Sequence, residues 1–278
     1  MPTDELTFMA VHAHPDDEVL STGGVLRKYR REGMHTVLVT CTGGELGDGL
    51  AGVKPGEAGH DEAQVRETRR RELEESCRVL EVEHLERLGY LDSGMEGWGE
   101  NGRTGSLSGS PLQEEVDRLA ELIRRHRPQV VVTYDQTGGY GHPDHIRTHQ
   151  LTVAACAATG IPQKVYYTAI PRSAVAAAAR RMREMGIDLS EFGGPDMDPD
   201  NPPFGTDDSL VTTSVEVGAE VEAKLAALRA HASQADNAFL LRFPQEVTMG
   251  FLAREHFIRA VDRRGSQLPE DDLFAGLR

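Results

Sequence analysis

The chain has 278 residues, a length that suits one large α/β domain or a domain with a smaller appended segment. Hydrophobic residues make up 38% and charged residues 27%, so the chain can bury a core. No run approaches the ~20 apolar residues that a membrane span needs. The net charge of −15 argues against nucleic acid or an anionic membrane as the main partner.

The first residues and the cysteines indicate a cytoplasmic protein. The start lacks the basic region of a signal peptide and runs directly into an apolar stretch. Cys41, Cys77 and Cys156 are far apart and have apolar neighbours. We therefore expect buried thiols rather than disulfides or a cysteine-based metal site. Nothing in the sequence indicates the oligomeric state.

Short apolar runs alternate with amphipathic stretches as far as residue 172. The expected strands are residues 6–13, 35–41, about 84–88, 129–134 and 164–170. The expected helices are about 19–32, 61–80, 112–126 and 143–159, with Gly-rich loops at 43–59 and 94–110. This alternation is typical of βαβ units, so it predicts an α/β, Rossmann-like fold with a mostly parallel sheet flanked by helices.

Beyond residue 172 the pattern loosens. We expect a helix at 174–185, a Pro/Asp loop at 193–208, a strand at 211–215, a helix at 221–233, and a helix and strand within 245–261. The predicted organisation is a catalytic core over 1–172, a smaller C-terminal α+β extension over 173–264 that completes the site, and a polar, partly disordered tail over 265–278.

Two motifs carry groups that suit metal binding and proton transfer. HAHPDDE, residues His12–Glu18, follows the first strand, and GGYGHPDH, residues Gly138–His145, follows the strand at 129–134. In an open parallel sheet, ligands bind beyond the carboxyl ends of the strands, where the strand order reverses. The two strands are commonly adjacent at that point, so we expect the two loops to meet.

The residue types in these loops match those of a catalytic zinc site. Such a site takes about three protein ligands and keeps one position for water or substrate. His14 and either Asp16 or Asp17 can come from the first loop, and a histidine from the second completes the set. The remaining aspartate can accept a proton from water, and an opposing histidine can protonate the leaving group. A dinucleotide site is disfavoured, because it would need a G-x-G-x-x-G turn where this chain has carboxylates.

The same motifs carry a resemblance to a known family. HPDDE with GHPDH, in the longer stretches VHAHPDDE, LDSGM, VVVTYDQTGGYGHPDH and LRAHASQ, resembles the PIG-L/LmbE-like zinc-dependent N-deacetylase superfamily. The resemblance is greatest to the mycothiol-pathway branch, which includes N-acetylglucosaminyl-inositol deacetylase and mycothiol S-conjugate amidase. It implies a hydrolase that removes an acetyl group from a small N-acetylglucosamine-type sugar conjugate, with Zn²⁺, or alternatively Fe²⁺, as its metal.

The resemblance also implies roles for individual residues of the two loops. His14, Asp17 and His145 would be the metal ligands, and Asp16 would be the general base. His142 would protonate the leaving amine or stabilise the oxyanion.

Further residues are assigned by the same resemblance. Asp144 would tune His142, and Tyr140 would help to polarise the carbonyl. Arg69 and Asp92 would bind sugar or inositol hydroxyls.

Two other functions stay open at this point. Ser21 and Gly141 favour the deacetylase over the conjugate amidase, whereas MAVHAHPDDE and TGGE resemble the amidase at least as closely. A non-catalytic metal-dependent sugar-binding protein would keep the three ligands without needing a base. The presence of both Asp16 and His142 counts against this alternative.

Four more residues near the motifs have no assigned role. We interpret His12 as a buried, hydrogen-bonded neighbour of the site rather than a ligand. His149 lies four residues after His145, a spacing at which both could bind one metal. His231 could approach the site or simply end a helix. Glu18 suits first-turn helix charge or support of the ligands.

Overall fold

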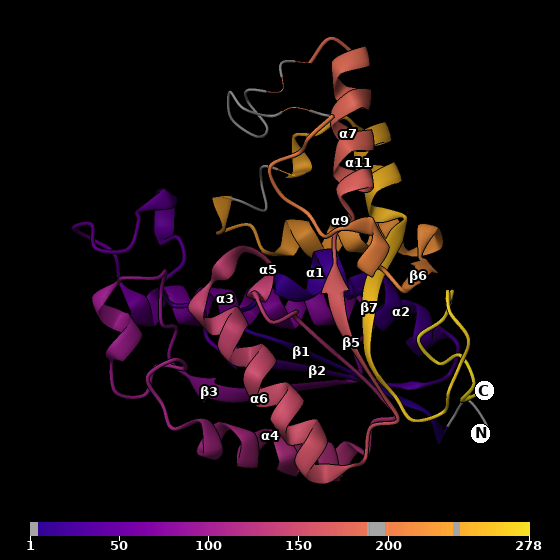
Figure 1. Ribbon diagram of the computed structural model, residues 1–278. Coiled ribbons are helices and arrows are strands. Elements are labelled where there is room, and N and C mark those ends of the chain that lie inside the picture. Colours follow the sequence, from indigo (N-terminus) through magenta and orange to yellow (C-terminus); the bar gives the residue numbers. More distant parts are fainter. Residues whose placement is uncertain (1–4, 188, 190–197, 199, 236–239) are drawn as a thin grey trace.

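One mixed sheet organises the chain, and its strand order is β3-β2-β1-β4-β5-β7-β6 (Figure 1). The computed structural model describes residues 5–187, 189, 198, 200–235 and 240–278. The strands in this part are β1 Thr7–His12, β2 His35–Thr42, β3 His84–Tyr90, β4 Val130–Thr133, β5 Lys164–Ala169, β6 Thr213–Glu216 and β7 Arg254–Asp262. Strands β1 to β5 pair in parallel, and β7 is antiparallel to both β5 and β6.

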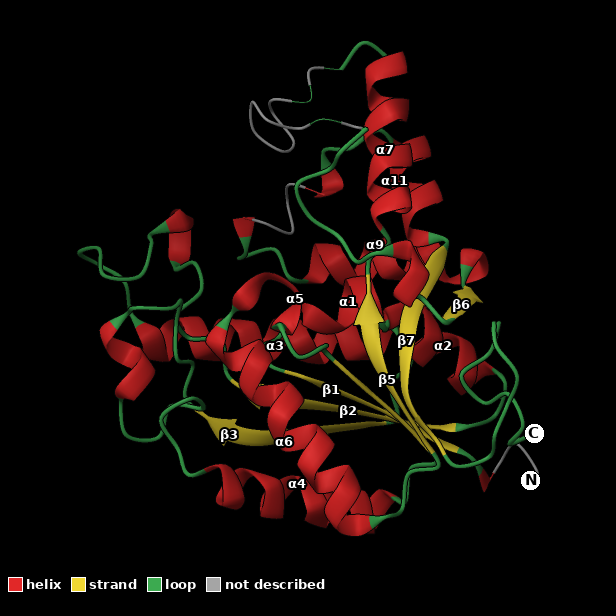
Figure 2. Cartoon of the chain, in the orientation of Figure 1, coloured by secondary structure: helices red, strands yellow, loops and turns green. Residues whose placement is uncertain are grey.

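Helices cover both faces of the sheet (Figure 2). They are α1 Asp17–Ser21, α2 Gly23–Arg31, α3 Glu62–Val79, α4 Leu112–His126, α5 Gly138–Gly141, α6 Pro143–Thr159, α7 Arg172–Glu184, α9 Val221–Ala230 and α11 Gln245–Leu252. Helices α2 and α3 enclose one apolar core, and α4 and α6 enclose another. Helices α7 and α11 pack on each other away from the sheet (Figure 1). Among the described helices, none is both long and apolar enough to cross a membrane.

The carboxyl ends of β1 and β4 lie side by side. In the parallel register, Met9 is opposite Val131 and Ala10 is opposite Val132. The apolar side chains of both strands are fully buried, which explains the near-continuous apolar runs in the sequence. The predicted Rossmann-like α/β fold is confirmed, and so is the expected adjacency of the two strands. The loops that follow them therefore begin at the same edge of the sheet.

The helix expected at about 19–32 is divided into α1 and α2 at Thr22. The hydroxyl of Thr22 is 2.8 Å from Nε2 of His12, and the residue has a non-helical φ of −142°. The carboxylate of Glu255, from β7, accepts the N–H groups of Gly24 and Val25 at 2.7 and 2.8 Å. It thereby satisfies donors at the start of α2, where negative charge is favourable. These contacts come from distant strands, so local helix propensity did not indicate the break.

The expectation of a partly disordered tail at 265–278 is wrong. Leu273, Phe274 and Leu277 are buried in the core beside α2. The tail also inserts Glu270, which accepts hydrogen bonds from the ammonium group of Lys164 at 2.6 Å and from the hydroxyl of Tyr166 at 2.8 Å. The charged side chains of the tail do not prevent this packing because they are paired: Glu270 with Lys164, and Arg278 with Asp272 and Glu32. The sequence feature that indicates packing of the tail is the short apolar pattern near its end.

We expect Phe274→Ala to lower the free energy of unfolding by ~3–5 kcal/mol, because it removes a fully buried aromatic ring and leaves a cavity. Chemical denaturation followed by circular dichroism measures this. Leu268→Ala is the matched control, since Leu268 lies in the same tail and is 50% exposed; it should change stability by no more than ~0.5 kcal/mol. Equal effects of the two substitutions would mean that the tail is not part of the core.

Candidate active site

Three side chains from the two loops present ligand atoms at nearly equal separations. Nδ1 of His14 is 3.3 Å from Nε2 of His145. The Asp17 carboxylate is 3.4 Å from His14 Nδ1 through one oxygen and 3.4 Å from His145 Nε2 through the other. In a tetrahedral site with bonds of about 2.0–2.1 Å, ligand atoms lie about 3.3–3.4 Å apart. These separations place His14, Asp17 and His145 within reach of one metal ion. Two other sets, His14–His142–His145 and His14–Asp92–Asp144, also bring ligand atoms within 4.8 Å of one another.

Hydrogen bonds fix the orientation of two of these ligands. Oδ2 of Asp17 accepts the backbone N–H of His14 at 2.8 Å and the hydroxyl of Tyr134 at 2.7 Å. The ring of Tyr134 also stacks on His145, with centroids 4.2 Å apart. Nδ1 of His145 is 3.2 Å from the carbonyl oxygen of Gly138, which can only accept. Nδ1 therefore carries the proton, and Nε2 offers its lone pair to a metal.

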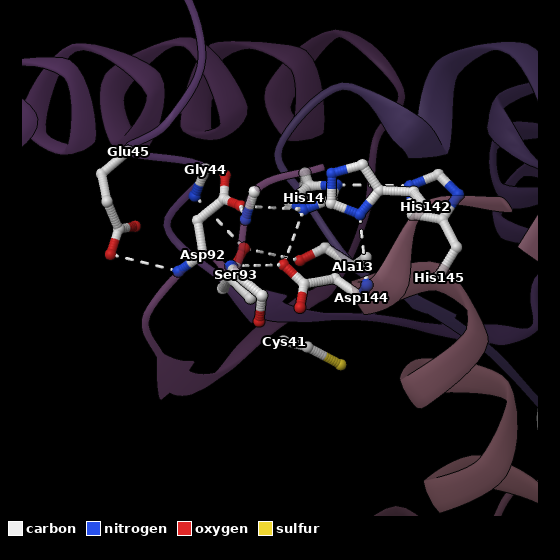
Figure 3. A network of polar contacts seen from close by, with 12 residues as sticks. Ala13, His14, Cys41, Gly44, Glu45, Asp92, Ser93, His142, Asp144 and His145 are labelled. Carbon is white, nitrogen blue, oxygen red and sulfur yellow. Dashed lines mark hydrogen bonds and ion pairs between the residues drawn. The ribbon is translucent and has the colours of Figure 1, made fainter. Parts of the chain in front are cut away.

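Asp144 orients His14 from the opposite side (Figure 3). Its Oδ2 lies 3.2 Å from Nε2 of His14 and accepts the N–H of Ser93 at 2.9 Å. A histidine that donates one ring N–H to a carboxylate presents the other nitrogen as a stronger metal ligand. The Asp144 carboxylate thus hydrogen-bonds to His14, and the backbone N–H of Asp144 bonds to His142. The expectation that Asp144 tunes His142 stays a prediction; burial lowers the pKa of His142, whereas the smaller effect of the Asp144 charge is to raise it.

Electrostatics at this centre favour a positive charge on His14. Burial alone would lower the pKa of His14, but the carboxylates of Asp92, Asp144 and Asp17 raise it well above its ordinary value. Burial alone would raise the pKa of Asp17, but His145 and His14 hold it well below its usual range. These carboxylates would also stabilise a bound metal cation, because the cation replaces the proton as their positive partner.

His142 is a neutral hydrogen-bond donor at this site. Its Nδ1 accepts the N–H of Asp144 at 3.1 Å, at the start of α6, so the ring proton sits on Nε2. Burial, together with nearby His14 and His145, lowers the pKa of His142 to about 3. Of the two roles expected for His142, this arrangement suits donation to an oxyanion better than protonation of a leaving group.

Asp16 has a backbone conformation that is rare for a residue other than glycine. Its φ is 107°, a region that costs about 1–3 kcal/mol. Glu18 accepts the N–H of Asp16 at 2.9 Å, and Arg69 donates to the carbonyl oxygen of Pro15 at 2.5 Å. The Pro15–Asp16 peptide is thus held on both sides. Burial raises the pKa of Asp16, and the nearby Asp17 acts in the same direction, while Arg69 opposes them.

Arg69 is the member of the ETRRREL segment that reaches the site. Its guanidinium is buried, lies 3.1 Å from the Asp16 carboxylate and donates to the carbonyl oxygen of Gly44 at 2.7 Å. Arg70 and Arg71 instead form exposed ion pairs with glutamates of α3. Arg69 therefore anchors Asp16 while it also lines the cleft, a positioning contact that the sequence did not indicate.

Glu18 and His231 form a buried pair behind Asp16. Oε1 of Glu18 lies 2.8 Å from Nε2 of His231 and accepts the hydroxyl of Ser76 at 2.5 Å. The other oxygen of Glu18 accepts the Asp16 N–H. Glu18 is therefore a support of the loop rather than one of the clustered ligands, and His231 approaches the site through it.

Two other histidines near the motifs, His12 and His149, have partners outside the ligand cluster. His12 is buried, with Nε2 bonded to Thr22 and Nδ1 3.3 Å from the hydroxyl of Tyr134, as its interpretation as a hydrogen-bonded neighbour requires. Nδ1 of His149 lies 2.9 Å from the carbonyl oxygen of Tyr134. The ring of His149 packs against Tyr167, so the partners of His149 are not the metal-ligand candidates His14, Asp17 and His145.

A cleft of about 290 Å³ opens over these groups. Tyr140 is 67% exposed at its rim, with its ring centroid 4.9 Å from that of His145. Asp92 lies deeper, 3.7 Å from Nε2 of His14. The cleft is also lined by residues that the sequence did not indicate, from the two Gly-rich loops and the LRAHASQ segment: Leu46, Asp48, Lys54, Pro55, Met95, Trp98 and Gln234.

The fold and the site define an α/β protein with a buried histidine–carboxylate centre at the switch point of a Rossmann-like sheet. Residues 9–156 match the family described as PIG-L, GlcNAc-PI de-N-acetylase. The chain belongs to this family.

The relatives match over nearly the whole chain. The chain is 40% identical to the 1D-myo-inositol 2-acetamido-2-deoxy-alpha-D-glucopyranoside deacetylase of Nocardioides sp., over 99% of this chain and 100% of that protein. It is 39% identical to the protein of the same name from Acidothermus cellulolyticus, over 98% of this chain and 95% of that protein.

Solved structures with lower identity share the fold. The N,N'-diacetylchitobiose deacetylase of Pyrococcus horikoshii has a TM-score of 0.58 and 21% identity, over 91% of this chain and 83% of that one. The 4-carboxy-2-hydroxymuconate hydratase of Pseudomonas putida has a TM-score of 0.59 and 18% identity, over 95% of this chain and 99% of that one. Since the two names denote different reactions, the fold alone does not specify the chemistry.

We expect Tyr134→Phe to weaken binding of Zn²⁺ by ~10–100-fold, because Asp17 loses the hydroxyl that orients it while the stacked ring remains. Competition against a chromogenic chelator measures the affinity. Tyr167→Phe, in β5, is the matched control and should bind Zn²⁺ as the unaltered protein does. An unchanged affinity of Tyr134→Phe would show that Asp17 is held without the hydroxyl.

Proposed function

We propose that this protein is a zinc-dependent N-deacetylase that hydrolyses the acetamide of an N-acetylglucosaminyl-inositol-type sugar conjugate. The observation that carries the proposal is the close packing of His14, Asp17 and His145, with separations of 3.3–3.4 Å, beside a cleft that His14, Asp17 and Asp16 line. The names of the relatives that match over nearly the whole chain support the choice of substrate. Fe²⁺ would suit the same ligands, and metal analysis of the purified protein distinguishes the two ions.

Zinc held by His14, Asp17 and His145 would polarise the amide carbonyl and lower the pKa of a water molecule to roughly 7. Asp16 takes the proton from the attacking water, since its carboxylate lines the cleft and Arg69 holds it in place. Asp16 then returns this proton to the leaving nitrogen. The C–N bond breaks, and acetate and a free amine are formed.

The remaining residues bind and orient the substrate. His142 donates its Nε2–H to the oxygen that gains negative charge, and Tyr140 at the rim assists in polarising the carbonyl. Asp92 accepts a hydrogen bond from a sugar hydroxyl. Arg69 serves mainly to position Asp16. The three cysteines are free and buried, which supports a reducing, cytoplasmic location for the enzyme.

We expect Asp16→Asn to reduce acetate release by ~10²–10⁴-fold, the usual contribution of a general base, while zinc stays bound. Asparagine tolerates a positive φ, so the backbone of the loop is preserved. Acetate assays and metal analysis of the purified protein measure both properties. Glu67→Gln, at an exposed position of α3, is the control and should keep full activity. Unchanged turnover would remove Asp16 from the mechanism, and loss of zinc would make it a ligand instead.

The substrate class is tested by comparing two reactions with the same enzyme. We expect kcat/KM for acetate release from N-acetylglucosaminyl-inositol to exceed that for cleavage of a mycothiol S-conjugate. The opposite order would make the protein a conjugate amidase. Tight binding of the first compound without release of acetate would point to a non-catalytic sugar-binding protein.

A further inference from the structure

A second hollow adjoins the cleft. Its volume is about 380 Å³, and it shares the wall residues Leu46, Pro55 and Trp98 with the cleft of about 290 Å³ that contains the ligand cluster. Both lie near the lower end of the ~300–1,000 Å³ range of ligand pockets. Each can therefore take one ring-sized unit, and a ligand of two rings would cross from one hollow to the other beside Trp98.

Trp98 is held at this boundary by its own loop. The Asn101 side chain donates to the carbonyl oxygens of Ser93 at 2.6 Å and Met95 at 3.0 Å, which fixes the turn. Gly94 has a φ of 68°, and a Cβ at this position would lie 2.5 Å from the indole ring. Glycine thus permits the ring to lie against the turn, where its side chain remains 40% exposed. A supported, exposed indole suits stacking on a ligand.

The polar groups of the second hollow indicate the chemistry of this ligand. Glu57, Glu62 and Glu100 line it. Glu62 pairs with Arg103 at 2.7 Å and one oxygen of Glu57 accepts the N–H of Lys54 at 2.8 Å, and the other carboxylate oxygens can accept hydrogen bonds from hydroxyl groups. Nε2 of His60 lies 2.9 Å from the carbonyl oxygen of Gly47, which ties this wall to the loop above the cleft. Carboxylates repel a phosphorylated ligand, whereas hydroxyl donors and an apolar ring face suit an uncharged polyol.

We infer that the second hollow is a subsite for the unit joined to the acetylated sugar, an uncharged polyhydroxylated ring that stacks on Trp98. This inference rests on the proposed function, because the acetamide must occupy the cleft. It makes Trp98 a specificity-determining residue: it binds the part of the substrate that does not react. A substrate without the second ring would lose this contact but keep those at the reaction centre.

Trp98 is the only tryptophan of the chain, so its fluorescence reports on this subsite without any need for turnover. We expect N-acetylglucosaminyl-inositol to change the fluorescence of Asp16→Asn protein saturably. Methyl N-acetylglucosaminide, which lacks the second ring, should produce little change at the same occupancy of the cleft. An inositol-phosphate version should bind more weakly. No change with the two-ring ligand, or equal binding of its phosphorylated form, overturns the inference.

Kinetics of the active enzyme provide the second measurement. We expect Trp98→Ala to lower kcat/KM for N-acetylglucosaminyl-inositol roughly tenfold and to lower that for methyl N-acetylglucosaminide by a clearly smaller factor, because the smaller compound meets only the side of Trp98 that lines the cleft. Trp98→Phe should restore most of the loss. Leu50→Ala is the matched control, because Leu50 is also exposed, at 58%, but lines neither hollow.

The outcomes separate this inference from the proposed function. If Trp98→Ala lowers kcat/KM equally for both substrates, or for neither, the inferred subsite is wrong although the enzyme remains a deacetylase. If the unaltered protein releases acetate from neither substrate, the deacetylase proposal fails. The fluorescence titration then still decides whether the second hollow binds the polyol ring.

Discussion

The turn at Asp16 is the constraint on which the rest of the site depends. Asp16 and Asp17 are neighbours in the chain, yet Asp17 lies with His14 and His145, whereas Asp16 lies against Arg69. The left-handed φ of 107° makes the change of direction, and its energetic cost is offset by hydrogen bonds to both ends of the Pro15–Asp16 peptide.

Those hydrogen bonds connect the loop to distant parts of the chain. Arg69 comes from α3, and Glu18 is itself held by Ser76 of α3 and by His231 at the end of α9. The C-terminal segment therefore stabilises the conformation of a loop close to the N-terminus. The same segment caps α2 through Glu255 of β7. Folding of the whole chain, rather than of the first motif alone, is what arranges the site.

Local pattern and general rules of topology were sufficient to predict where the site lies in the fold, but not which residues of the two loops have which role. The buried runs of β1 and β4 and the switch-point rule predicted that the two loops would meet. The family resemblance then selected His14 and His145, and the structure brings these two side chains together. Local pattern and topology did not predict that Tyr134 orients Asp17 or that Asp144 contacts His14. Both contacts depend on which side chains face each other across the edge of the sheet. The break at Thr22 and the buried Phe274 likewise result from long-range contacts that leave little local signal.

The site divides into a reaction centre and the loop walls beside it. His14, His142 and His145 are buried, and Asp16 and Asp17 are partly buried. They lie after β1, in α1 and at the start of α6, where a misplacement of about one ångström would cost activity. The walls that would meet the rest of the substrate, Leu46, Pro55 and Trp98, come from the two Gly-rich loops, which the strands only anchor. Loops accept changes in sequence without loss of the core. One scaffold can therefore keep its reaction centre while the loops select the molecule on which it acts.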